Sequence, residues 1–141
     1  MKAVERLAKI RFEARAENLQ GARDQVRGAV LKKGYASETI NCIVLAVDEA
    51  CSNIIRHGYG EGKTGDIILE VLYSQDELIF RLTDFADQVD KKKLCSRDLD
   101  DIRPGGLGVH LIKKVMDSFE YLDGPQGVGN VLELRKKVAP S

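Results

Sequence analysis

A carboxylate and a carboxamide stand four residues apart in the segment VDEACSNIIRHGY, residues 47–59. Apolar residues recur through and before this segment at i, i+3, i+4 and i+7, which predicts a helix that places Glu49 and Asn53 one turn apart. At roughly 100° per residue, both side chains lie nearly opposite the apolar stripe. The stripe consists of Ile40, Ile43, Val44, Val47, Cys51 and Ile54. Glu49 and Asn53 are therefore expected outside the core, and because their flank also carries Cys42, Leu45 and Ala46, they are expected to line an enclosed space.

Two kinds of chemistry fit this pair. It could be a hydrogen bond on a helix surface, with no further role. Alternatively, the Asn53 carbonyl oxygen could bind Mg²⁺, which prefers oxygen ligands and keeps several waters. Glu49, one turn away, could then orient and deprotonate an attacking hydroxyl or water. The spacing alone leaves both interpretations open.

Two more polar side chains are expected to point inward from strands. Asp84 shares the parity of the apolar face of the preceding strand, and it stands where that strand ends. Asn130 has the same relation to Leu132 and Leu134 at the start of a later strand. A carboxylate aimed at the core needs hydrogen-bond donors, because burying it unpaired is costly. Asp84 could cap a turn, or it could accept a hydrogen bond from the exocyclic amine of adenine.

The glycine-rich run RPGGLG, residues 103–108, precedes a helical pattern. It could simply begin that helix. It could also bind phosphate, because amide groups at a helix N-terminus are exposed where no Cβ intervenes. The run is not a Walker loop, since the GxxxxGK[ST] lysine is missing, and the chain has neither GxGxxG nor the kinase HRD and DFG motifs.

The elements that must position these residues follow from hydrophobic periodicity. Strands alternate with period two and helices repeat every three to four residues. Ser37 is expected as the N-cap of the helix that carries Glu49. The expected order is a strand over 8–15, helices over 17–33 and 37–58, a hairpin of strands over 66–73 and 77–83, a charged segment over 85–103, a helix that reaches Phe119, and strands over 119–122 and 131–138. Consecutive strands with helices grouped together predict a two-layer α+β sandwich with a mixed, mostly antiparallel sheet.

Composition excludes several classes of protein. The 141 residues are expected to form one domain, residues 1–141, and 22 basic side chains balance 22 acidic ones. No field therefore favours direct binding of nucleic acid or of an anionic membrane. No apolar run approaches the roughly 20 residues that span a bilayer, and the start does not resemble a signal peptide. Three cysteines without CxxC spacing favour neither disulfides nor zinc. Cys42 and Cys51 are interpreted as small core residues, and a cytoplasmic location is expected.

Taken together, Glu49-xxx-Asn53 before HGY, the strand-end Asp84 and the GGLG run resemble the GHKL (Bergerat-fold) ATPase superfamily. The segments AVDEACSNIIRHGY and RPGGLGVHLIKKVMD are most similar to those of the bacterial anti-sigma-factor serine/threonine kinases. The resemblance extends from the first strand to Val138. It implies a domain that binds ATP or ADP with Mg²⁺ and that phosphorylates a serine or threonine on a STAS-domain anti-anti-sigma protein. It also implies binding to a sigma factor, control of transcription by partner switching, and possible homodimers.

Position by position, the resemblance implies Glu49 as the general base, Asn53 as the Mg²⁺ ligand and Asp84 as the adenine anchor. It implies a nucleotide lid over residues 87–103. The implied phosphate cradle consists of Gly105, Gly106, Leu107, Gly108 and Val109. Asn130 stands where the superfamily usually has a threonine near adenine.

The sequence departs from the superfamily at DxGxG, which here reads DFADQ over residues 84–88. Ala86 replaces the first glycine and still permits close approach to the base, because it adds only a methyl group. The departure keeps an alternative open, a nucleotide-sensing module that binds partners without catalysis. The catalytic half of a histidine kinase is the third interpretation, and it is disfavoured because no helical hairpin with a phosphoacceptor histidine is expected before the domain.

Overall fold

The computed structural model describes residues 3–59, 64–86, 107–122, 124 and 128–137, which form a five-stranded sheet covered by helices. The strands are β1 (Glu5–Glu13), β2 (Asp66–Ser74), β3 (Glu77–Asp84), β4 (Ser118–Leu122) and β5 (Asn130–Lys137). Their order across the sheet is β1-β2-β3-β5-β4, and every pairing among them is antiparallel. The expected α+β fold with a mostly antiparallel sheet is confirmed.

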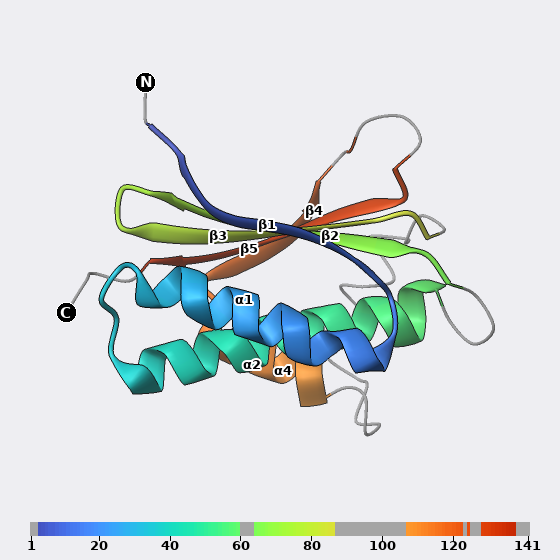
Figure 1. Ribbon diagram of the computed structural model, residues 1–141, viewed down its shortest axis with the longest axis horizontal. Helices are drawn as coiled ribbons and strands as arrows, with labels where there is room; N and C mark the ends of the chain where they lie inside the picture. Colours follow the sequence, from blue (N-terminus) through green and yellow to red (C-terminus); the bar gives the residue numbers. More distant parts are fainter. Residues whose placement is uncertain (1–2, 60–63, 87–106, 123, 125–127, 138–141) are drawn as a thin grey trace.

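The helices of the described part lie together on one face of this sheet (Figure 1). They are α1 (Leu19–Leu31), α2 (Ser37–Asn53) and α4 (Leu107–Val115), with the short η1 (Ala16–Asn18) before α1 and the π-helical η2 (Ile54–Tyr59) after α2. Helix α2 packs against both α1 and α4. It therefore occupies the centre of the helical layer, and its residues can contact the sheet on one side and line a site on another.

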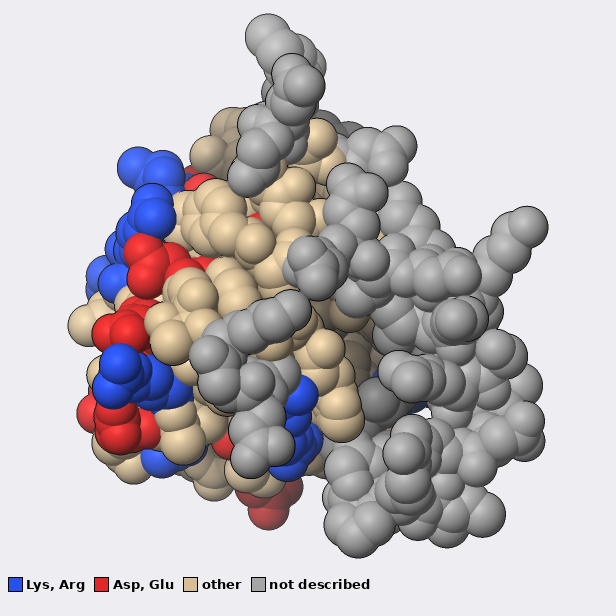
Figure 2. Space-filling view, turned by 90° about the vertical axis from the view of Figure 1, so that its right-hand side faces the viewer, with Lys and Arg blue, Asp and Glu red and all other residues tan. Residues whose placement is uncertain are grey.

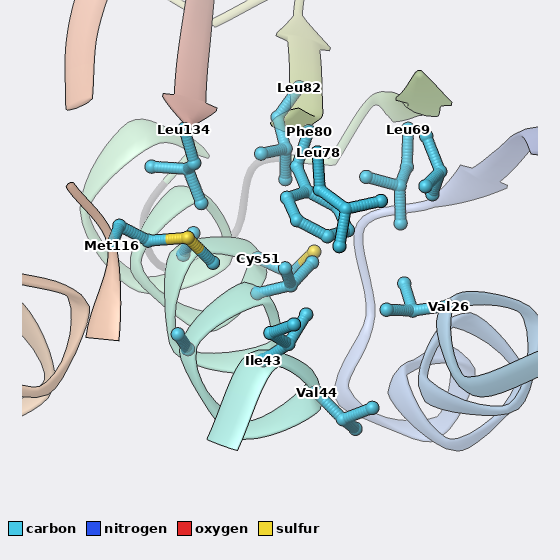
Figure 3. Close-up of a cluster of buried hydrophobic side chains, with 14 of the residues drawn as sticks. Val26, Ile43, Val44, Cys51, Leu69, Leu78, Phe80, Leu82, Met116 and Leu134 are labelled. Carbon is cyan, nitrogen blue, oxygen red and sulfur yellow. The ribbon is translucent and has the colours of Figure 1, made fainter. Parts of the chain in front are cut away.

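The core lies between α2 and the sheet, as the period-two and helical patterns predict. Leu78, Phe80 and Leu82 of β3 are each completely buried, as is Ile43 of α2. Figure 3 shows side chains of the sheet pointing toward those of α2, with Met116 closing one end of the cluster. The alternation that buries Leu82 also turns Asp84 toward the helices.

Arginine side chains fasten α1 to α2. Arg23 donates a hydrogen bond to Asp48 at 2.9 Å, and Arg27 donates one to Asn41 at 2.8 Å. Pairs of this kind, partly exposed, each contribute only about 0.2–1 kcal/mol. The apolar contacts of Val26 and Val30 with the core therefore hold α1 in place, and the arginines fix its orientation.

Three local predictions are wrong. Ser37 is the first residue of α2 rather than its N-cap, because Ala36 occupies the cap position with extended backbone and no side-chain hydrogen bond. Phe119 belongs to β4 and not to the helix, since α4 ends at Val115. Cys42 is exposed, because it shares the side of α2 on which Leu45 is 53% exposed. Cys51 is buried as predicted.

The turn between β2 and β3 is the short hairpin that the sequence predicts. Gln75 and Asp76 form it with φ of 49° and 63°. Two successive residues with positive φ are typical of a type I′ turn, whose twist matches that of the flanking strands. The register set by this turn pairs Ile67 with Asp84 and so brings the start of β2 beside the end of β3.

Candidate functional site

Glu49 and Asn53 lie on a partly exposed side of α2, away from its buried residues. The Glu49 side chain is 31% exposed. The expectation that both lie outside the core is confirmed. Their roles as general base and metal ligand stay predictions.

Arg56 of η2 connects the two side chains. Its Nη2 donates to the Asn53 Oδ1 at 3.0 Å and lies 3.5 Å from the Glu49 Oε2. The guanidinium therefore already donates a hydrogen bond to the carbonyl oxygen that would bind Mg²⁺. The sequence reasoning missed Arg56, although its position three residues after Asn53 and seven after Glu49 places it on the same helix side.

Oxygen donors of this kind fit Mg²⁺. A carboxamide carbonyl and a carboxylate are ligands that Mg²⁺ accepts while it keeps water and phosphate oxygens in its remaining positions. No cluster of three or more histidine, cysteine, aspartate or glutamate side chains suited to a metal occurs among the described residues. A magnesium ion bound to the Asn53 carbonyl oxygen could therefore complete its coordination with water and phosphate oxygens.

Asp84 and Asn130 form the second half of the candidate site. They pair across β3 and β5, and they are 3% and 8% exposed. The Asp84 Oδ1 accepts hydrogen bonds from the Asn130 Nδ2 and from the Ala86 N–H, both at 3.0 Å. Burial raises the pKa of the Asp84 carboxyl, and these donors oppose the rise because they stabilise its charged form. The predicted inward orientation of both residues is confirmed.

The chain that leaves β3 passes very close to the turn before β5. A Cβ added to Gly129 would lie 2.0 Å from the Ala86 carbonyl oxygen and 2.7 Å from the Ala86 nitrogen. The Gly129 N–H donates to the Asp84 carbonyl at 2.9 Å. Gly129 is therefore required by close backbone approach. The sequence reasoning missed it, although a glycine directly before Asn130 was a usable signal.

The same segment also contacts the end of the helix that carries Glu49 and Asn53. A Cβ added to Gly58 of η2 would lie 3.7 Å from the Ala86 Cβ, an ordinary van der Waals distance. Ala86 thus lies between η2 and Gly129. The Phe85 N–H also donates to the hydroxyl of Tyr59 in η2 at 2.9 Å, and this bond brings the Glu49–Asn53 half of the site next to the Asp84–Asn130 half.

The predicted phosphate cradle is only partly within the described residues. Gly105 and Gly106 lie outside them, as does the predicted lid over 87–103. Of Leu107, Gly108 and Val109, the structure describes the backbone alone. Helix α4 begins at Leu107, so the prediction of a helix after the glycine run is confirmed. Its buried Ile112 and Val115 belong to the core, and the helix packs on α2. Helix α4 is thereby held against the helix that carries Glu49.

Two general features of the described residues concern membrane-spanning helices and surface charge. In the part of the chain that the structure describes, no helix is both long and apolar enough to cross a membrane. On the face that Figure 2 presents, basic and acidic side chains lie beside one another along the left edge and the lower part, and the centre is mostly uncharged.

Known proteins match most of this chain. A family model described as a histidine kinase-like ATPase domain matches residues 12–136. The serine-protein kinase RsbW of Halalkalibacterium halodurans is 31% identical over 115 residues, which cover 76% of this chain and 70% of the relative. The serine-protein kinase RsbW of Bacillus pumilus is 27% identical over 124 residues, 81% of this chain and 76% of the relative. The serine-protein kinase RsbW of Listeria monocytogenes is 29% identical over 132 residues, which cover 87% of this chain and 83% of the relative.

Proposed function

This chain belongs to the family of histidine kinase-like ATPase domains, and on that premise we propose how its own residues carry out phosphoryl transfer. The protein is an anti-sigma-factor serine/threonine kinase of the GHKL superfamily, and the resemblance seen in the sequence is confirmed. A non-catalytic nucleotide-sensing module is correspondingly disfavoured. The roles of individual residues, the metal and the partners are proposals.

In the proposed reaction, the Glu49 carboxylate accepts the proton of the substrate hydroxyl as the hydroxyl oxygen attacks the terminal phosphorus of ATP, and ADP leaves. Asn53 would hold Mg²⁺ through its carbonyl oxygen. The metal, when bound, neutralises charge on the phosphate oxygens, and positioning supplies most of the remaining catalysis. The observation that supports this most is the partly exposed Glu49–Asn53 pair on α2, adjacent through Ala86 to a buried carboxylate that can anchor a base.

At the other end of the nucleotide, Asp84 accepts the exocyclic amine of adenine, with Asn130 and the Ala86 N–H holding its carboxylate. The amides of residues 105–109 cradle the phosphates, and residues 87–103 close over them. Both remain expectations from the resemblance, and they apply to ATP and to ADP.

The proposed protein partners are a STAS-domain anti-anti-sigma protein as the phosphorylated substrate and a sigma factor as the sequestered partner. Homodimers and a cytoplasmic location are proposed with them. Direct binding of nucleic acid is not expected, because 22 basic side chains are balanced by 22 acidic ones. Arg23 and Arg27 on α1 are candidates for contact with a partner, although each already donates a hydrogen bond to a residue of α2.

The test is transfer of labelled phosphate from ATP, with Mg²⁺, to STAS-domain proteins of the same genome. We expect label on a serine or threonine, and a loss of roughly 10²–10⁴-fold in Glu49→Gln, the range for a general base. Glu38→Gln is the matched control, because Glu38 is an exposed glutamate in the first turn of the same helix. Undiminished transfer by Glu49→Gln would contradict the role of Glu49, and failure to label any STAS-domain protein would contradict the substrate class.

A further inference from the structure

Tyr59, the last residue of η2, has its hydroxyl between two strand ends. The side chain is buried, at 7% exposed. Its hydroxyl donates a hydrogen bond to the Asp66 carbonyl at 2.6 Å and accepts one from the Phe85 N–H at 2.9 Å. Asp66 begins β2 and Phe85 directly follows β3. One hydroxyl group thus joins the helical segment after Asn53 to the end of the strand that carries Asp84.

The second of these bonds reaches the peptide group on which Asp84 depends. The Asp84 carbonyl and the Phe85 N–H belong to the same peptide unit. The Gly129 N–H donates a hydrogen bond to the Asp84 carbonyl at 2.9 Å. On the other side of the peptide unit, the Tyr59 hydroxyl accepts a hydrogen bond from the Phe85 N–H. That peptide unit is therefore held at both its polar atoms. Its orientation fixes where the next amide, that of Ala86, meets the Asp84 carboxylate at 3.0 Å.

The ring of Tyr59 is confined as closely as its hydroxyl. A Cβ added to Gly65 would lie 2.4 Å from the Tyr59 Cε1 and 2.6 Å from its hydroxyl oxygen. Gly65 is itself held, because its carbonyl accepts the Ala14 N–H at 2.7 Å. The chain before β2 thus presses directly on the ring, and the hydroxyl has little freedom to leave the junction.

We propose that Tyr59 is a positioning residue for base recognition, which aims the Asp84 carboxylate at the adenine amine through the Asp84–Phe85 peptide. This inference rests on the proposed function, in which Asp84 anchors adenine. Tyr59 touches neither the base nor the phosphates in this assignment. Loss of its hydroxyl frees one side of the peptide unit, so the carboxylate loses its fixed direction while Glu49 and Asn53 stay on α2.

The test compares two nucleotides that differ only at the group Asp84 would recognise. ATP and purine riboside triphosphate are titrated in the presence of Mg²⁺, and the second lacks the 6-amino group. A hydrogen bond to a charged acceptor predicts that the wild-type protein prefers ATP by about tenfold or more. We expect Tyr59→Phe to reduce this preference at least threefold by weakening ATP binding while purine riboside triphosphate binds nearly as before.

Tyr73→Phe is the matched control, because it removes the same group at the opposite end of β2, where the Tyr73 hydroxyl donates to Asp76 at 2.9 Å beside the hairpin turn. Its preference for ATP should equal that of the wild type. Should Tyr59→Phe fail to fold, Gly65→Ala provides the second variant, since its added methyl displaces the ring while the hydroxyl is retained. It should reduce the preference in the same way.

An unchanged preference in the Tyr59 variant, or an equal loss of affinity for both nucleotides, overturns the inference, because a residue that only stabilises the fold would not distinguish the two ligands. Absence of binding of either nucleotide by the wild-type protein is a separate result. It would overturn the nucleotide function itself, and this inference with it.

Discussion

At the residue scale, the buried carboxylate of Asp84 affects both the free energy of unfolding and the binding of a nucleotide. Burial raises the pKa of its carboxyl above the ordinary value of 3.8. Between the unfolded and the folded pKa the native state binds more protons, so its stability falls as pH rises through that window. At neutral pH the buried charge therefore reduces stability, and a ligand that donates to it recovers that loss.

Asp84→Asn consequently should stabilise the nucleotide-free protein at pH 7 and abolish the preference for ATP. The free energy of unfolding, measured by urea denaturation from pH 7 down to pH 3, tests this. The advantage of the variant should shrink as pH falls, because Asp84 becomes protonated in both states near pH 3. An advantage that grows toward low pH would contradict the direction of the pKa shift.

Arg56 gives a second prediction at this scale. Its guanidinium bonds the Asn53 oxygen, so a metal ion must displace it. The Arg56 side chain is 48% exposed, and such contacts are worth about 0.2–1 kcal/mol, so the competition is modest. Arg56→Gln should lower the Mg²⁺ concentration for half-maximal phosphoryl transfer by up to about fivefold.

The control for this change is Arg6→Gln, which removes an exposed arginine of β1 that lies 3.9 Å from Glu70. Its Mg²⁺ requirement should equal that of the wild type. A higher Mg²⁺ requirement in Arg56→Gln would mean that Arg56 assists metal binding instead of competing with it.

The four side chains on which the candidate site is built could be oriented from the sequence, because strand parity and helical angle decide them. Asp84 and Asn130 face inward, and Glu49 and Asn53 lie off the core. Helical spacing also places Arg56 on the side of Glu49 and Asn53, but Tyr59 and Gly129 could not be found in this way. Their roles depend on contacts between segments far apart in the chain, and no local period encodes these.

At the scale of elements, the site depends on how closely the end of β3 approaches the turn before β5. Sequence periodicity predicts the strands, but it does not predict how closely Ala86 approaches Gly129. A glycine in a loop can serve a turn, a flexible joint or a close approach, and the sequence does not distinguish these. Hydrophobic periodicity also does not predict where a helix ends. The π-helical turn of η2, which carries Arg56 and Tyr59, continues the same residue pattern as an α-helix, so only the structure distinguishes them.

Gly129→Ala tests the close approach. The added methyl would lie 2.0 Å from the Ala86 carbonyl, so the backbone after Asp84 must move. We expect a loss of about 1–3 kcal/mol in the free energy of unfolding, as for overpacking, together with weaker ATP binding. Denaturant unfolding and nucleotide titration measure the two effects.

Gly28→Ala is its control, since Gly28 lies within α1 and a Cβ there meets nothing within 4 Å. That change should stabilise the protein by about 0.5–1 kcal/mol, because alanine loses less backbone entropy in a helix. If Gly129→Ala behaved like Gly28→Ala, the approach of Ala86 to Gly129 would not exist in solution.

At the scale of the whole molecule, the α+β fold followed from the order of the elements, since strands grouped apart from helices leave few ways to bury the apolar faces. The family followed from motifs, not from composition. Residues 85–103 gave no periodic signal, so neither the lid nor the start of the phosphate cradle could be derived from pattern. That residues 1–141 make up one ATP-binding domain stays a prediction.

The buried Cys51 and the exposed Cys42 allow nucleotide binding to be measured through its effect on the free energy of unfolding. Cys51 is 1% exposed and points into the cluster between α2 and the sheet (Figure 3). Burial raises its thiol pKa to about 12, so the native protein holds almost no Cys51 thiolate at pH 8. Alkylation of Cys51 therefore requires opening of the core, whereas the exposed Cys42 can react directly.

We expect iodoacetamide at pH 8 to modify Cys51 at least about a thousandfold more slowly than Cys42, given a stability of roughly 5 kcal/mol or more. Mg-ATP at 100 times its dissociation constant should slow Cys51 a further hundredfold or so, because binding to the native state adds about 2.7 kcal/mol. Peptide-resolved mass spectrometry separates the two sites. Equal rates at Cys42 and Cys51 would contradict the core packing. Slow modification of Cys51 that Mg-ATP leaves unchanged would instead contradict nucleotide binding, so the two conclusions can fail independently.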